Sequence, residues 1–71
     1  MKKHQVRARL VERGTSYRQW AMAHNYQPRT VTQAVNRWAG KSSLPRGRLT
    51  YQILRDLSRY IGQEVTEGVL A

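Results

Sequence analysis

The chain has 71 residues, no cysteine and a formal net charge of +9, from 13 Lys and Arg against 4 Asp and Glu. A chain of this length forms one domain with a small core. The absence of cysteine excludes disulfides and thiolate metal sites and fits a reducing intracellular compartment. The charge favours a polyanionic partner, because binding releases the counterions condensed on it; the alternative is a basic surface that is merely solvated.

No apolar run in the sequence is long enough to span a bilayer. At the N-terminus, Lys2 and Lys3 are followed by arginines rather than by an apolar segment, which is not the pattern of a secretory signal. We therefore expect no membrane partner.

The first predicted element is a helix over residues 3–13, whose thin apolar stripe includes Val6 and Leu10. Gly14 is expected to end it, because glycine adopts the left-handed cap conformation without steric cost. The polar residues expected to face water or phosphate are Arg7, Arg9, Glu12 and Arg13.

A second helix is expected to begin at Thr15 or Ser16. Ser16 and Gln19 have the spacing of a capping box, in which the hydroxyl accepts from a backbone N–H and the glutamine reaches back. Such an exposed, polar helix N-terminus binds phosphate well. The spacing i, i+3, i+4, i+7 predicts an inward face made of Tyr17, Trp20, Ala21 and His24.

A short break at residues 25–28 leads to a third helix, predicted from Pro28 to Ala39 and stopped by Gly40. Asn25 tolerates the left-handed conformation that ends a helix, and proline suits the first position of the next one. Two short amphipathic helices joined by a tight turn form a helix-turn-helix, whose second helix enters the major groove of DNA. The predicted inward face of this second helix is Val31, Ala34, Val35 and Trp38.

The outward face of the third helix carries the candidate base-reading residues. Arginine can bond to guanine in bidentate fashion, glutamine and asparagine can do so with adenine, and a threonine methyl can contact thymine. No acid occurs between Gln27 and Trp38, so no carboxylate would be pressed against phosphate. The outward residues are Arg29, Thr32, Gln33, Asn36 and, near the end of the helix, Arg37.

Residues 41–48 form a predicted loop that contains Ser, Pro, Gly and several cations. A basic loop that leaves a reading helix is well placed to clamp a phosphate backbone, and we favour this over a solvated surface connection. The expected phosphate contacts are Lys41, Ser42, Arg46 and Arg48 in the loop, with Ser16, Arg18 and Arg37 on the helices.

A fourth helix is predicted to follow Leu49 and Thr50 and to end near Ile61, with an apolar stripe that closes the core. This places the DNA-binding domain at residues 1–62. Residues 63–71 form a weakly alternating tail, which is either a disordered end or a dimerisation arm. The predicted stripe of the fourth helix is Leu49, Ile53, Leu54, Leu57 and Ile61.

Catalytic and metal sites find little support in the sequence. The four acids are scattered, and no pair has the spacing to hold two carboxylates over one substrate. His4 and His24 lie on separate elements with no nearby acid, and no glycine-rich phosphate loop occurs. We interpret His24 as partly buried and hydrogen-bonded, and Trp20, Tyr26 and Trp38 as core residues rather than base-stacking ones. No catalytic residue, metal, cofactor or small-molecule substrate is expected.

From Ala21 onward the sequence resembles the helix-turn-helix of the Cro and lambda-repressor-like fold. The resemblance rests on Ala21, the turn residue Asn25, the aromatic Tyr26, and then Val31 with Ala34-Val35. Asn25 stands where this family usually has glycine, and His24 where it usually has an aliphatic residue. The layout from Arg13-Gly14-Thr15-Ser16 to Leu44-Pro45-Arg46-Gly47 is similar to Ner-type regulators of transposable Mu-like phages.

This resemblance implies a small repressor that binds an operator as a dimer or as paired monomers and controls the switch between early lytic and lysogenic transcription. The exposed reading positions that it implies are Gln27, Pro28, Arg29, Thr32, Gln33 and Asn36.

The sequence as a whole predicts an all-α, lambda-repressor-like domain of four, at most five, helices. It predicts a transcriptional regulator that binds specific double-stranded DNA in the cytoplasm of a bacterium or of a phage's host. One alternative is a sequence-neutral nucleoid or RNA-binding module, which binds through its positive charge alone. The other is an excisionase-like or transposition accessory factor.

Overall fold

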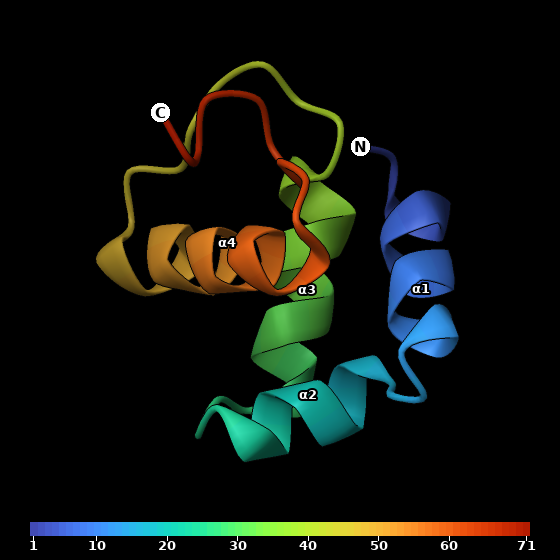
Figure 1. Ribbon diagram of the computed structural model, residues 1–71. Coiled ribbons are helices and arrows are strands. Elements are labelled where there is room, and N and C mark those ends of the chain that lie inside the picture. Colours follow the sequence, from blue (N-terminus) through green and yellow to red (C-terminus); the bar gives the residue numbers. More distant parts are fainter.

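The computed structural model describes all residues 1–71, which form four helices and no strands (Figure 1). The chain is therefore all-α, and the helix count is four rather than five. None of the helices has the length and apolar character needed to cross a membrane. The helices are α1 (Lys3–Glu12), α2 (Tyr17–Ala23), α3 (Pro28–Trp38) and α4 (Arg48–Ile61).

Local sequence signals set most of the helix ends. The Ser16 hydroxyl caps α2 by accepting from the Gln19 N–H at 3.2 Å, whereas the reciprocal contact expected from the Gln19 side chain is not formed. Asn25 is the only non-glycine residue with a positive φ, at 61°, and asparagine is among the few side chains that adopt this conformation readily. Pro28 opens α3 as expected. The turn between α2 and α3 is therefore encoded locally.

The helix α3 stands at the centre of the molecule and contacts each of the other three helices (Figure 1). Its inward stripe of small and branched side chains allows close packing against α2 and α4. The core contains residues from all four helices and from the C-terminal segment. Its buried apolar members are Val6, Leu10, Trp20, Ala21, Val31, Ala34, Val35, Ile53, Leu54, Leu57, Ile61, Val65 and Val69.

The start of α4 differs from the sequence prediction. The helix begins at Arg48, which the sequence pattern places in the preceding loop. Leu49, predicted to be part of the apolar stripe, is 53% exposed. The first turn of α4 projects past α3 (Figure 1). The stripe is buried only from Ile53 onward.

Residues 63–71, expected to be a disordered end or a dimerisation arm, instead fold back onto the core. Val65 and Val69 are buried. The Gly40 N–H donates to the Val65 carbonyl at 3.0 Å, and the Thr66 hydroxyl donates to the carbonyl of Trp38 at 2.9 Å. The segment therefore covers the C-terminal end of α3 and belongs to the same packed unit as residues 1–62.

A buried serine connects this segment to α4. The Ser58 hydroxyl donates to the Leu54 carbonyl at 2.6 Å and accepts from the Val65 N–H at 3.0 Å. Both hydrogen-bonding roles of the hydroxyl are thus satisfied inside the protein, as a buried polar group requires. The radius of gyration of 10.6 Å matches the value of about 11 Å for a compact chain of this length.

Candidate nucleic-acid interface

One open groove runs between α1, the start of α2 and α3. It consists of two hollows of about 350 and 320 Å³, which adjoin because Arg7, Tyr17 and Thr32 line both. We call it the basic groove. Its lining residues are Lys3, His4, Arg7, Leu10 and Val11 from α1, Ser16, Tyr17 and Arg18 from the start of α2, and Pro28, Arg29, Thr32 and Asn36 from α3.

The basic groove contains several cations and no acid. Small-molecule pockets are lined mainly by apolar side chains, whereas most residues that line this open groove are polar or charged, even though the apolar parts of their side chains form much of its surface. An extended polyanion fits these properties better than a compact ligand does. The cations of the groove are Lys3, Arg7, Arg18 and Arg29.

The acids of the chain lie elsewhere. Glu12 pairs with Arg9 at 3.3 Å. The carboxylate of Asp56, on α4, accepts a hydrogen bond from the Tyr26 hydroxyl. Glu64 and Glu67 belong to the C-terminal segment. None of the four acids therefore lines the basic groove.

The outer face of α3 flanks the groove. Arg29, Gln33 and Asn36 are exposed and follow one another at the i, i+4, i+7 spacing of one helical stripe. Arg37 is also exposed. The Thr32 hydroxyl donates to the Pro28 carbonyl at 3.0 Å, which leaves its methyl group as the part free for an apolar contact.

The two remaining positions that are predicted to read bases lie at the N-terminal end of α3. Gln27 is exposed and is the N-cap residue, but its side chain makes no capping hydrogen bond. Pro28 is half-buried in the wall of the groove. The amide of Gln27 is thus free for another partner, whereas Pro28 offers only an apolar ring.

Tyr17 joins the two N-terminal helices beneath the groove. Its hydroxyl donates to the Lys3 carbonyl at 3.3 Å, so the start of α2 is tied to the first turn of α1. Burial raises the pKa of Tyr17 above its ordinary value, and the positive charge of Arg7 partly offsets that rise. Arg7 and Tyr17 are therefore electrostatic neighbours in the wall of the groove.

A second tyrosine fixes the turn in front of α3. The Tyr26 hydroxyl donates to the Asp56 carboxylate of α4 at 2.6 Å, and its ring stacks on Trp20 at 5.9 Å. Burial, with the hydrogen bond and negative charge of Asp56, raises the pKa of Tyr26 to about 12. Trp20 itself is only 2% exposed. Trp20 therefore lies in the core, whereas Tyr26 and Trp38, also expected there, are half-buried and pack against it. The contacts of Tyr26 link the turn before α3 to α4 and to Trp20.

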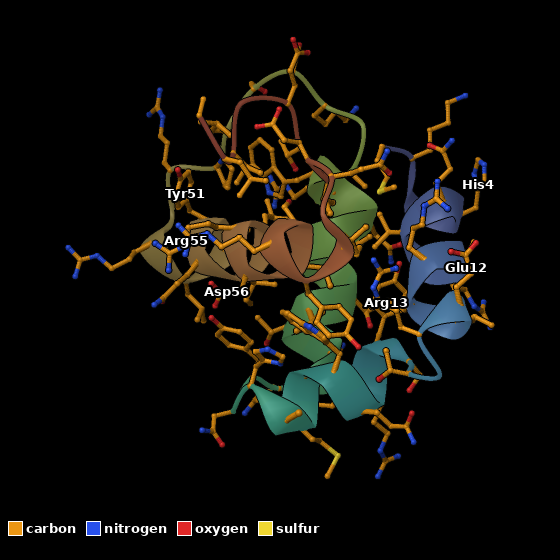
Figure 2. The ribbon with its side chains drawn as sticks, in the orientation of Figure 1. His4, Glu12, Arg13, Tyr51, Arg55 and Asp56 are labelled. Carbon is orange, nitrogen blue, oxygen red and sulfur yellow. The ribbon has the colours of Figure 1, made fainter.

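His24 differs from its expected place on the inward face. The residue is exposed, because it follows the last residue of α2 as the C-cap and lies over the outer side of Trp20. Its ring stacks on Trp20 at 4.3 Å, and Nδ1 lies 2.9 Å from the Trp20 carbonyl oxygen. His4 extends outward from α1 (Figure 2), and no cluster of three or more His, Cys, Asp or Glu residues occurs.

The basic loop 41–48 lies apart from the groove. It leaves the C-terminal end of α3 and runs beside the C-terminal segment (Figure 1). Lys41 lines a separate hollow together with Glu64 and Glu67, and the Glu67 N–H donates to its carbonyl at 3.0 Å. The structure thus brings Ser16 and Arg18 together with the predicted reading residues Pro28, Arg29 and Thr32, but not the exposed loop residues Lys41, Ser42, Arg46 and Arg48.

The sequence predicts that Arg7 faces water or phosphate, but it does not indicate that α1 forms one wall of the groove beside α3. Lys3 and Arg7 have the i, i+4 spacing of one helical face, but that spacing does not reveal which neighbour the face meets. Arg13, expected to face water or phosphate, instead donates to the Ile61 carbonyl at 2.9 Å and points toward α4 (Figure 2). Its guanidinium lies 5.8 Å from the centre of the Tyr60 ring.

No protein-family model, no curated protein and no solved structure matches the chain.

Proposed function

We propose that the chain is a transcriptional regulator that binds specific double-stranded DNA and inserts α3 into the major groove. In this proposal α2 and α3 form a helix-turn-helix of the lambda-repressor-like type. The observation that carries the proposal is the exposed, acid-free face of α3 beside the basic groove. The proposed biological role is that of the Ner-type phage repressors, which the sequence resembles.

The dimensions of α3 support this function. Eleven residues give a helix about 16 Å long, which spans several base pairs. The major groove is about 12 Å wide and accepts one α-helix. Because Tyr26 holds the turn against α4, α3 would enter the groove as a rigid element, without an ordering cost on binding.

Each exposed side chain of α3 has a defined role in this proposal. Arg29 bonds to guanine O6 and N7, and Gln33 and Asn36 bond to adenine N6 and N7. The Thr32 methyl contacts a thymine methyl, and Gln27 approaches the bases from the start of the helix. Residues assigned to phosphates fix the register of the protein on the duplex without reading sequence. These residues are Ser16, Arg18, Arg37, Lys41, Ser42, Arg46 and Arg48.

Selection from a random duplex pool tests the proposal. The wild-type protein is expected to return a defined motif with approximate two-fold symmetry. Arg29→Ala should cost about 1–3 kcal/mol in binding and relax the preference at one base pair. Arg59→Ala removes an equally exposed charge from α4 and should return the wild-type motif.

Other outcomes of the selection would identify the alternatives. If the wild-type protein returns no motif, and its affinity for duplex or RNA collapses with salt, it is a sequence-neutral binder. If it returns a motif that Arg29→Ala leaves unchanged, α3 is not the reading helix. Whenever a motif is selected, a recombination assay on that site separates a transcriptional regulator from an accessory factor of transposition or excision.

A further inference from the structure

We propose that one phosphate strand of the bound duplex lies along the basic groove, and that Lys3 and Arg7 of α1 are its main sequence-neutral contacts. This inference rests on the proposed function. It assigns to α1 a phosphate-binding role that would otherwise fall to the loop 41–48.

Arg7 and Lys3 lie in the groove beside residues of α3. Arg7 lines both hollows of the groove together with Thr32 of α3. Lys3 lines the second hollow opposite Asn36. A reading helix in the major groove has a phosphate strand along each of its sides. A strand that follows the groove would meet cations of α1 on one side and base-reading residues of α3 on the other.

The side chains of Lys3 and Arg7 have no partner within the chain. Lys3 and Arg7 are exposed, and neither side chain makes a hydrogen bond or an ion pair within the chain. Other arginines are engaged: Arg9 pairs with Glu12, Arg13 donates to the Ile61 carbonyl, and Arg55 pairs with Asp56. A phosphate would therefore bind Lys3 and Arg7 without breaking an existing interaction.

The backbone of α1 around Lys3 and Arg7 is held in place by the rest of the protein. The main chain of Lys3 accepts the Tyr17 hydroxyl at 3.3 Å, and Val6, one residue before Arg7, is fully buried. The backbone that carries both cations is thus fixed to α2 and to the core. Only the side chains need to be ordered when a phosphate binds, which limits the entropy cost of the contact.

The side chains of the loop cations also make no hydrogen bond or ion pair within the chain, so surroundings and position are what distinguish them from Lys3 and Arg7. Lys41 lies in a hollow with two glutamates, whose negative charge offsets its attraction for a polyanion. The loop also sits at the C-terminal end of α3 (Figure 1), whereas Arg29 lies in the first turn of that helix. We therefore assign the larger share of the phosphate attraction to α1.

The test compares two double variants that remove the same charge. Lys3→Gln with Arg7→Gln changes the groove, and Lys41→Gln with Arg46→Gln changes the loop. All four residues are exposed, and circular dichroism and thermal melting should show that both variants keep the wild-type fold. Affinity is measured at a series of salt concentrations for a duplex that carries the selected motif and for a scrambled duplex.

The groove variant is expected to weaken binding to both duplexes and to reduce the slope of log K against log salt by about 1.8, which corresponds to two lost phosphate contacts. The loop variant should change the slope by less than half of that. An equal or larger change in the loop variant, or an unchanged slope in the groove variant, would overturn the inference.

Neutral methylphosphonates placed along the duplex locate the strand. Phosphates whose neutralisation weakens the wild-type protein, but not the groove variant, should lie beside the base pair whose preference relaxes in Asn36→Ala, because Lys3 and Asn36 line the same hollow. The two proposals fail separately. Absence of a selected motif refutes the proposed function, whereas a selected motif with dominant loop contacts refutes only the role of α1.

Discussion

At the scale of single residues, the contact between Tyr26 and Asp56 links the turn before α3 to α4 at 2.6 Å. Tyr26→Phe keeps the ring on Trp20 but removes this hydrogen bond to a charged acceptor. The variant should lose about 1.5 kcal/mol of unfolding free energy, the lower end of the range for such bonds. Urea denaturation measures the loss. The control is Tyr60→Phe: the Tyr60 hydroxyl has no partner in the chain, so this variant should keep the wild-type stability.

The same pair predicts a dependence of stability on alkaline pH. In the unfolded chain Tyr26 loses its proton near the ordinary tyrosine pKa of 10.0, whereas in the folded chain the pKa is about 12. Between these values the folded state binds more protons, so the unfolding free energy falls as pH rises. The contribution of Tyr26 is complete below pH 10 and is lost by about pH 12. Wild type and Tyr26→Phe should therefore converge in stability across this interval, and parallel curves would contradict the assignment.

At the scale of elements, the C-terminal segment offers a direct test of its place in the core. Val65 is 0% exposed, whereas Leu70 in the same segment is 40% exposed. Val65→Ala should cost about 2 kcal/mol of unfolding free energy, because it removes buried methyl groups and leaves a cavity. Leu70→Ala should change stability by less than about 0.5 kcal/mol. Equal, small effects of both variants in urea denaturation would mean that the segment does not pack as described.

The features that could be predicted from the sequence are those with local causes. Ser16 caps α2, Asn25 takes the positive φ and Pro28 opens α3, each because of its own side chain and immediate neighbours. The apolar stripe of α4 was also predictable from Ile53 onward, because its spacing is helical.

Features set by contacts distant in sequence were not predictable. Leu49 has the spacing of a core residue, but its exposure depends on which elements distant in sequence pack against the first turn of α4. The Thr66 hydroxyl donates a hydrogen bond to the carbonyl of Trp38, 28 positions away, and no pattern in residues 63–71 predicts that contact. The basic groove has the same origin, since Lys3 meets Asn36 only through the packing of α1 beside α3.

At the scale of the whole molecule, size limits how much DNA one copy could contact under the proposed function. The principal extents are 28 × 20 × 18 Å, which is shorter than one turn of the duplex at about 34–36 Å. A single copy can therefore present α3 to only one stretch of the major groove. The few base pairs contacted there give modest discrimination, at about 1–3 kcal/mol for each mismatched base pair. Useful specificity requires a second copy on a neighbouring half-site.

Under the proposed function we therefore expect two copies to bind one face of the duplex. Sedimentation with a duplex that carries two half-sites about 10 base pairs apart should give a complex of two proteins and one duplex. Inserting about 5 base pairs, half of one helical turn, places the half-sites on opposite faces and should weaken binding of the second copy. Inserting about 10 restores the face and should recover part of the affinity, because the copies again lie along the same side. A one-to-one complex, or binding indifferent to spacing, would show that each copy acts alone.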